Sequence, residues 1–526
     1  MKIINRSLLT SLALSLSSLA FAQQPVWNTV VKNPVSFARY AVPLDGGGTL
    51  VFLSASNFVR LDGQGNTVTQ GQVALTFNVM NAISDGAGGA YLVGIEAQGA
   101  IGGPTLGGLD AVVTRVNANG QEIWSKRIGG SETDIGRGIL LDGGELVIAG
   151  STASPDFGVP SGSFYFSDGF LARLDPTDGS VLWVTRDNTG LERTSYWDVV
   201  RTLQGDWLLT GTTEDYLGCI SPVIARYTSG GSLLSLENQF FYYSFGDIAV
   251  NGSGYVAVVN PHSGKVNCVG FDASGIAQFH VDLHSSNDST AFSVVSVSPD
   301  LFVMGGWAIE QTSQGPVEVR SLRAFDSAGT VLWDLQIPDP TGANGHVHDL
   351  AVDRDGGLFA CGRTSFDPSM PGGPKDAWVG YIAIDRLGVP GCAAQPNSTG
   401  VAASTLAVGS DVRADNRVIL GTSSLPIGQF GFYLASTTSG LVSGPGGSQG
   451  DLCLGGSIGS FNRAGEVQLS GSDGLFSLVL DLRDIPTPSG SVSATAGQTW
   501  NFQSWYRDRN PGATSNFSSS VLVTLN

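Results

Sequence analysis

Basic residues are scarce in this chain. Charged side chains make up 14% of its 526 residues, lysine occurs only five times, and the formal net charge is −18. The few basic residues do not gather into a cluster. Nucleic acids and anionic membrane surfaces are bound through basic patches, so the composition excludes both as partners.

Long apolar segments are absent beyond the N-terminus. The run 8–19 follows Lys2 and Arg6 and precedes small residues at Ala20 and Ala22. This order predicts a signal peptide at 1–22, cleaved after Ala22, with an uncleaved anchor as the alternative. No later run reaches the ~18–20 apolar residues that a spanning helix needs. We therefore expect the mature chain to be secreted or held at the cell surface, without membrane insertion after cleavage. The periplasm is the alternative location.

Cysteine occurs only five times, which in an exported chain is compatible with disulfide formation. Cys392 and Cys453 flank the start of the C-terminal region and form the first predicted disulfide. Cys219 and Cys268 lie near the start of the same type of strand in successive repeats, which suggests a second bridge. Cys361 lies in the apolar strand 358–362 and is expected to be a buried, free thiol.

The sequence signatures of common catalytic sites are missing. The chain contains no Gly-x-Ser-x-Gly, no His-Glu-x-x-His and no phosphate-binding loop. The segment 175–179 lacks the alternating carboxylates of a calcium loop. We therefore assign no catalytic residue and expect no cofactor, apart from the divalent cation considered below.

Glycine, in contrast, is abundant, with 72 residues, and it favours tight turns over helix interiors. Seven hairpins share the form apolar–x–x–apolar–Asp–x–x–Gly. Their fifth positions are Asp62, Asn117, Asp175, Thr228, Asp272, Asp326 and Asp385. A repeat of this length that carries only strand patterns predicts an all-β fold, a seven-bladed β-propeller at 23–392.

Each repeat contains four strand patterns, and a bulky residue follows most hairpins. Trp124, Trp183, Phe279 and Trp333 occupy this position and are expected to pack between neighbouring blades. The seventh repeat lacks its fourth strand, whereas the mature chain begins with an unassigned strand at 26–31. That strand could complete the last blade and remove two exposed sheet edges.

Residues 393–526 form a separate region rich in serine, threonine and glycine. Alternating apolar and polar residues at 466–470, 476–481 and 521–525 predict half-buried antiparallel strands. A region of this length suits a small β-sandwich. The prediction is therefore a two-domain chain, a propeller followed by a sandwich.

Two sequence resemblances bear on these domains. The segments 124–130, 139–150 and 168–173 resemble the repeat of bacterial secreted seven-bladed β-propeller (SBBP) proteins. The segment 500–521, with Cys392 and 397–400, resembles a C-terminal module of secreted planctomycete and myxobacteria-like proteins. Both resemblances imply an exported protein. Neither implies catalytic residues.

The histidines at 346 and 348 form the one cluster with metal-ligand spacing. On an extended strand they would face the same side, as two ligands of a divalent cation require. No third ligand follows from the spacing. A polar entry to the innermost strand of the last blade is the alternative.

Aligning the repeats on their glycine turns brings a set of polar residues to one level. Asp349 falls level with Asp198, Asp247, Asn81, Ser293, Arg39 and Gly136. These positions begin the innermost strands and would surround one mouth of the central channel, next to Tyr196 and Trp197. The ring could bind a ligand or a cation, or it could be solvated channel lining.

The arginines at 60, 115, 173 and 226 share one hairpin position. Salt bridges between blades are the expected explanation for this recurrence.

The sequence therefore favours an exported, non-catalytic recognition or scaffold protein that binds a polysaccharide or a cell-surface protein. A glycoside hydrolase or lyase that uses Asp198, Asp247 and Asp349 is one alternative, since paired carboxylates can run such chemistry. A structural envelope component without a discrete ligand is the other.

Overall fold

The structure, a computed structural model, describes most of the chain from residue 25 onward. It covers 25–526 except 32–36, 45–46, 54–56, 73–76, 97–102, 159–166, 188–192, 203, 216, 239–244, 251–253, 260–266, 273–275, 285–288, 299–300, 313–314, 327, 338–344, 354–356, 365–375, 383, 385–386, 410, 417, 471–473, 475 and 510. The predicted signal peptide at 1–22 lies outside the described residues. Within them, regular structure is β except for two 3₁₀ turns, η2 (Arg413–Asp415) and η3 (Pro445–Gly447). No helix in this part of the chain is long and apolar enough to cross a membrane.

The first part of the chain folds into four-stranded antiparallel sheets, of which the described residues form seven. From the innermost to the outermost strand they are β2 (Ala38–Pro43), β3 (Thr49–Leu53), β4 (Asn57–Leu61), β5 (Thr67–Gln72); β6 (Asn78–Ser84), β7 (Ala90–Glu96), β8 (Asp110–Val116), β9 (Glu122–Ile128); β10 (Asp134–Asp142), β11 (Glu145–Thr152), β12 (Asp168–Leu174), β13 (Val181–Arg186); β14 (Arg193–Arg201), β15 (Trp207–Glu214), β16 (Ile220–Tyr227), β17 (Leu233–Asn238); β18 (Phe245–Val250), β19 (Gly254–Val259), β20 (Cys268–Asp272), β21 (Ala277–Val281); β22 (Ser289–Ser298), β23 (Leu301–Thr312), β24 (Gly315–Phe325), β25 (Val331–Ile337); and β26 (Gly345–Val352), β27 (Leu358–Thr364), β28 (Ala377–Ile382), β1 (Pro25–Val31).

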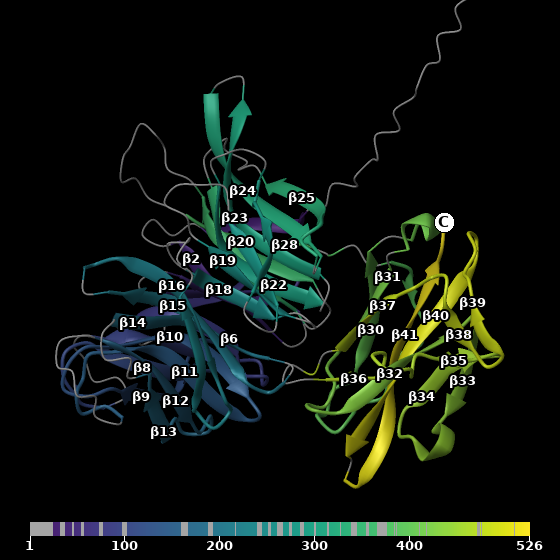
Figure 1. The fold of residues 1–526 in the computed structure, drawn as a ribbon, viewed down its shortest axis with the longest axis horizontal. Helices are drawn as coiled ribbons and strands as arrows, with labels where there is room; N and C mark the ends of the chain where they lie inside the picture. The colour runs from purple at the N-terminus through teal and green to yellow at the C-terminus, as the bar shows by residue number, and fades with distance from the viewer. Residues whose placement is uncertain are drawn as a thin grey trace, which may run out of the picture.

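The innermost strands of these sheets contact one another in a closed circle. The order is β2, β6, β10, β14, β18, β22 and β26, and β26 contacts β2 again. The strand β1 pairs antiparallel with β28, with Trp27 opposite Tyr381, so the first described strand completes the last sheet. The predicted all-β propeller is thereby confirmed (Figure 1).

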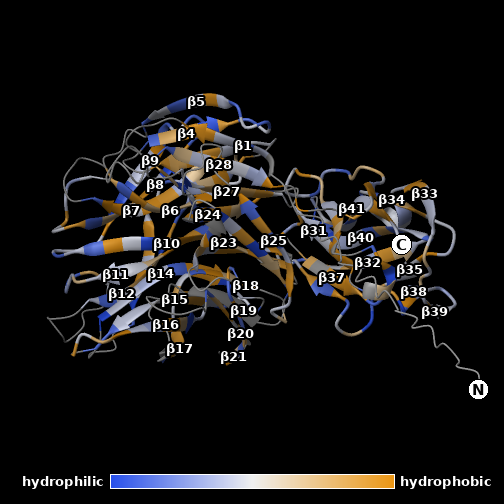
Figure 2. Cartoon of the chain, turned by 90° about the horizontal axis from the view of Figure 1, so that it is seen from above, coloured by the Kyte–Doolittle hydropathy of each residue, from blue (hydrophilic) through white to orange (hydrophobic). Residues whose placement is uncertain are grey.

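Apolar patterning explains which strands form the core of each sheet. Every residue of β3 is buried, whereas nearly every residue of the outer strand β5 is exposed. Apolar colour accordingly runs through the interior of both parts of the chain (Figure 2). The runs of Val, Leu and Phe lie between neighbouring sheets, where burial contributes roughly 25 cal/mol per Å² of apolar surface.

The hairpin glycines provide the space in which neighbouring sheets meet. Gly179 has a φ of +73°, and a Cβ there would lie 2.6 Å from the Trp124 ring of the preceding sheet. Gly65 stands in the same relation to Trp27 of β1, at 2.5 Å. Only glycine fits both the conformation and the close approach. The bulky residues therefore pack between sheets as expected, and Trp27 takes this role where the ring closes.

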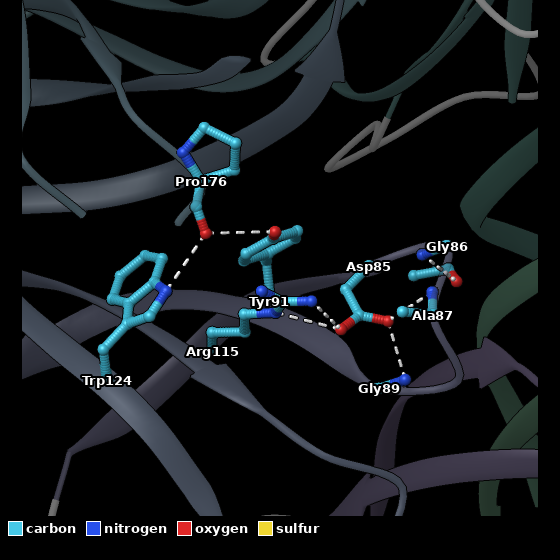
Figure 3. Close-up of polar contacts among 9 residues, drawn as sticks. Asp85, Gly86, Ala87, Gly89, Tyr91, Arg115, Trp124 and Pro176 are labelled. Carbon is cyan, nitrogen blue, oxygen red and sulfur yellow. Dashed lines mark hydrogen bonds and ion pairs between the residues drawn. The ribbon is translucent and has the colours of Figure 1, made fainter. Parts of the chain in front are cut away.

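Figure 3 shows one such contact between sheets. Tyr91 Oη and Trp124 Nε1 both donate hydrogen bonds to the Pro176 carbonyl of the next sheet, at 3.2 and 3.1 Å. Arg115 pairs at 2.9 Å with Asp85 of its own sheet. The prediction of salt bridges between blades is wrong here, because the turn before the second strand of the same sheet presents the nearer carboxylate. Arg226 pairs with Asp206 of its own sheet in the same way.

The C-terminal part consists of further antiparallel sheets. They contain β29 (Val389–Pro390), β41 (Ala513–Thr524), β40 (Thr499–Arg509), β32 (Phe430–Ser436), β35 (Gly459–Ser460) and β36 (Gln468–Leu469); β30 (Ser404–Gly409), β31 (Val418–Ser423) and β37 (Phe476–Leu480); β33 (Thr438–Ser443) and β34 (Asp451–Gly455); and β38 (Ile485–Thr487) and β39 (Gly490–Val492).

The two largest of these sheets share one apolar core. Leu420 and Phe476 from one sheet are buried together with Tyr433 and Phe502 from the other. The outward side of β30 and β31 joins a different core, in which Val408 and Ile419 pack with residues of the sixth and seventh ring sheets. The C-terminal part is therefore attached to the ring through buried apolar contacts as well as through the chain.

Candidate functional site

Each innermost ring strand contains a β-bulge. An extra residue interrupts the pairing with the second strand in every sheet, and in β18 the irregularity covers Asp247 as well. The residues at these bulges are Arg39, Met80, Arg137, Trp197, Gly246, Phe292 and His348. Because the sheets are built alike around the ring, the bulges lie at the same end of it, which we call the bulge mouth. Bulges often re-aim side chains beside binding sites.

The residue that follows each bulge belongs to what we call the inner ring. It consists of Tyr40, Asn81, Gly138, Asp198, Asp247, Ser293 and Asp349. The sequence alignment placed Arg39 and Gly136 at this level, and that register is wrong. Arg39 lies one residue earlier, at the bulge, and Gly136 lies before the bulge. The extra residue at each bulge shifts which residue of the strand reaches the inner ring. It does not change the spacing between the glycine turns, on which the alignment was based.

The inner-ring side chains connect neighbouring strands. Four of them accept a hydrogen bond from the backbone N–H that follows the inner-ring residue of the next strand. The pairs are Asp198 with Ile248, Asp247 with Val294 at 2.8 Å, Ser293 with Leu350 at 3.2 Å, and Asp349 with Ala41 at 2.8 Å. The last of these bonds spans the closure of the ring. Buried backbone N–H groups need such partners, so these side chains stabilise the propeller.

The third sheet contributes glycine to the inner ring and thereby lets its neighbours meet. Asn81 Nδ2 donates to Asp198 Oδ1 at 3.3 Å, from the second sheet to the fourth. A Cβ on Gly138 would lie 3.0 Å from the Asp198 backbone. The structure thus places Asn81, Asp198, Asp247 and Asp349 in one hydrogen-bonded network around the ring.

Burial alters the protonation of the inner-ring carboxyls. It raises the pKa of Asp349 to about 8, helped by the negative charge of Asp247. Burial also raises the pKa of Asp198 well above its usual range, with Asp247 again adding to the effect. Asp198 and Asp247 are hydrogen-bonded to each other, so the neutral form of Asp198 donates to Asp247. Two carboxyls this close favour holding a shared proton.

Stability is therefore expected to decrease as the pH rises through the window set by Asp349. A pKa that folding raises means that the folded state binds the proton more tightly. The stabilisation is complete below the unfolded pKa of about 3.9 and is lost as the pH passes the folded value of about 8. Asp349→Asn mimics the neutral carboxyl and should flatten the decline in the free energy of unfolding, measured by urea denaturation at intervals from pH 5 to 9.

Asp326→Asn is the matched control, because Asn117 occupies the same turn position in the second repeat. It should keep the wild-type pH dependence. A parallel decline in wild type and Asp349→Asn would contradict the prediction.

The structure separates the two aromatic residues assigned to the mouth. Tyr196 is fully buried, and its hydroxyl bonds to Asp187 at 3.1 Å and to Tyr227 at 3.0 Å. Its assignment as a ligand-binding residue is wrong, because it faces the core between sheets. Trp197, at the bulge, is half-buried, with the Arg137 guanidinium 5.2 Å from its ring centroid.

Other aromatic and basic residues at the same end of the ring form a second group of contacts. We call the two groups together the bulge cluster, which consists of Phe37, Arg39, Arg137, Trp197, Phe292 and His348. Arg39 lies over Phe37 at 5.2 Å, and the His348 ring lies 5.1 Å from Phe37 and 5.2 Å from Phe292. Sequence reasoning missed Phe37, Arg137 and Phe292. For Arg137 and Phe292, the available signal was that an aromatic or basic residue stands immediately before the inner-ring position in five of the seven repeats.

The predicted metal pair does not form a metal site. His346 Nε2 contacts Glu318 at 2.8 Å, and its Nδ1 contacts the Arg363 guanidinium at 2.9 Å. Burial lowers the pKa of His346, and the Arg363 charge adds to this effect. Both ring nitrogens are thus engaged, one of them by a cation, while the His348 ring centroid lies 6.0 Å away. Within the described ranges, no three His, Cys, Asp or Glu side chains are grouped as metal ligands.

One of the two predicted disulfides is present, and the other is not. The predicted disulfide between Cys392 and Cys453 is present. The suggested bridge between Cys219 and Cys268 is wrong, because both are free thiols. Cys268 is fully buried within a core between sheets, whereas Cys219 is exposed at the end of a turn. The two residues share a place in the repeat pattern but not a surface.

Comparison with known proteins does not assign the chain to a family. No family model and no curated protein matches the chain. Solved structures similar to it include BamB from Moraxella catarrhalis, with 12% identity, 64% of this chain and 83% of that one covered, and a TM-score of 0.35. The WD40 β-propeller domain of Doa1 has 11% identity, coverages of 68% and 96%, and a TM-score of 0.41. The WD40 domain of Neurospora crassa Pan2 has 10% identity, coverages of 70% and 97%, and a TM-score of 0.45.

Proposed function

We propose that this protein is a non-catalytic scaffold that binds a protein partner at the bulge mouth of its ring. The observation that carries the proposal is the use of the inner-ring carboxylates. Asp198, Asp247 and Asp349 each accept a backbone N–H from the next strand. They therefore serve the ring itself, and the surface available for recognition is the bulge cluster at the mouth.

A hydrolase or lyase fits this arrangement poorly. Glycosidic bond cleavage uses two carboxyl groups about 5–10 Å apart, with the sugar between them. Asp198 and Asp247 are instead bonded to each other, and Asp247 also accepts from Ser293 Oγ at 2.7 Å. A sugar ring would have to break these bonds to enter.

The bulge cluster favours a protein partner over a polysaccharide. Sugar recognition relies on open aromatic faces, but Arg137 lies over Trp197 and His346 stacks on Phe292 at 6.1 Å. Arginine and large aromatic residues are the types that dominate the energetics of protein interfaces. These features support a protein as the partner.

An extracytoplasmic location supports the same function. The predicted signal peptide at 1–22 and the disulfide between Cys392 and Cys453 both suit an oxidising compartment. We take residues 23–392 as the propeller and 393–526 as a β-sandwich module docked against it. Pairing with the C-terminal sheets already begins at Leu387, just ahead of this boundary.

Site-specific photo-crosslinking in the cells that produce the protein tests the proposal. Met80 lies at the bulge of β6, and replacing it with benzoylphenylalanine places a probe at the mouth. Leu182 on β13, 48% exposed, provides a control position on the outer strand of another sheet. We expect protein adducts from position 80 and none of the same mass from position 182.

The two rival functions predict different outcomes. Adducts that consist of polysaccharide would contradict a protein partner. The absence of any adduct specific to position 80 would favour a structural component without a discrete ligand.

A further inference from the structure

Two arginines at the bulge mouth lack a counter-charge. Arg39 and Arg137 are half-buried, and neither has a carboxylate within ion-pair distance in the part of the chain that the structure describes. Several other arginines of the ring are paired with carboxylates, such as Arg127 with Glu96 and Asp110. Partly desolvated cations are costly unless they are compensated, so this pair requires an explanation other than stability of the fold.

Hydrogen-bond donors at the same place are also unused. Arg39 Nε, Arg137 Nε and Trp197 Nε1 are buried atoms with no acceptor among the described residues. Buried donors in native proteins nearly always have a partner, and exceptions often mark a site for a ligand or ion. All three missing partners are acceptors, which suits an oxygen-bearing anion.

The two guanidinium groups lie near the same side chain, that of Tyr40. The Tyr40 hydroxyl is hydrogen-bonded to Arg39, and it is also near enough to Arg137 to raise the pKa of that guanidinium. Burial nevertheless leaves the pKa of Arg137 below its ordinary value. Met80 belongs to the sheet between theirs, so the two arginines flank its bulge from either side.

Both guanidinium groups lie over aromatic rings. Arg39 lies over Phe37 and Arg137 over Trp197, each at 5.2 Å from the ring centroid. A guanidinium that stacks through its face still presents its N–H donors in the plane, in the fork that matches a carboxylate. Lysine would offer no such fork.

We propose that Arg39 and Arg137 form a carboxylate-binding site that receives an acidic side chain from a peptide segment of the partner. This assignment rests on the proposed function, which names a protein as the partner. A peptide is favoured over an acidic saccharide, because the aromatic faces at the mouth are covered. With a net charge of −18, the chain as a whole repels acidic ligands, so the two arginines also select where such a segment can dock.

Binding of a fluorescein-labelled hexaglutamate peptide to the purified full chain, measured by anisotropy at about 0.15 M salt, tests the site. Arg39→Gln and Arg137→Gln should each weaken binding about tenfold or more, the loss of one charge-assisted contact. Arg483→Gln changes an exposed arginine of the C-terminal part and should leave binding unchanged. Arg137→Lys should fall between wild type and Arg137→Gln. Both glutamine variants should unfold at the wild-type temperature or above, because an uncompensated cation has been removed.

Three results would overturn the site: no binding of hexaglutamate, unchanged binding in both glutamine variants, or tighter binding of hexagalacturonate than of hexaglutamate. The crosslinking from position 80 keeps this failure distinct from failure of the scaffold proposal. Protein adducts that persist equally in Arg39→Gln and Arg137→Gln would reject the carboxylate site and leave the scaffold intact. Adducts that decrease in both variants would support it.

Discussion

Replacing Arg127 with methionine should lower the free energy of unfolding by about 3–5 kcal/mol, among the largest effects of any single substitution in the ring. Arg127 on β9 contacts Glu96 at 2.5 Å and Asp110 at 2.6 Å, and all three side chains are at most 3% exposed. Without the cation, two buried carboxylates face each other uncompensated. Urea denaturation followed by tryptophan fluorescence measures the loss.

The same triad offers its own control. Adding Glu96→Gln and Asp110→Asn to Arg127→Met removes the orphaned charges and should restore most of the stability, since the cost comes from unpaired charge rather than from lost packing. Arg483→Met, whose ion pair with Asp481 is exposed, should change the free energy by less than about 0.5 kcal/mol. A loss below about 1 kcal/mol in Arg127→Met would contradict the prediction, because it would mean that water screens the charges of the two carboxylates.

Loss of the disulfide between Cys392 and Cys453 should cost about 4 kcal/mol by the chain-entropy estimate. The bond joins residues 61 positions apart and ties the start of the C-terminal part to β34. Breaking it enlarges the conformational freedom of the unfolded segment. Calorimetry of the double variant Cys392→Ser/Cys453→Ser should show a lower unfolding temperature than wild type.

Chemical reduction separates the effect of losing the disulfide from any other effect of the two serine substitutions. A thiol reductant should lower the unfolding temperature of the wild type toward that of the double variant and leave the double variant unchanged. Cys219→Ser, which alters an exposed free thiol, should respond to the reductant as wild type does. Insensitivity of the wild type to the reductant would contradict the prediction that the bond restricts the unfolded chain.

The sequence predicts features of this fold that depend on turns and apolar periodicity. The hairpin at Asp62 forms as expected, with Gly65 N–H donating to the Asp62 carbonyl at 3.0 Å. The glycine at the end of the hairpin also indicates how the sheets pack. A large aromatic ring from a neighbouring sheet occupies the space that a side chain at Gly65 would fill. The pairing of β1 with β28 likewise follows from counting strands.

The inner strands show what such patterns miss. A bulge adds one residue to a strand yet leaves the apolar pattern on both sides of it intact. The pattern therefore could not assign Tyr40 rather than Arg39 to the inner ring, or distinguish buried Tyr196 from half-buried Trp197. The partners of the inner-ring carboxyls are backbone N–H groups of the next strand, which no side-chain pattern reports.

The pairing of β1 with β28 also has a temporal consequence. During synthesis the strand that begins at Pro25 emerges first, and its partner around Ile382 is made only after all the other ring strands. Contacts between such distant parts of a chain form late and slowly. A chain that stops before β28 leaves β1 without its partner, and one that stops before β26 also leaves Ala41 without the Asp349 carboxylate. Closure of the ring therefore requires synthesis to have reached β28.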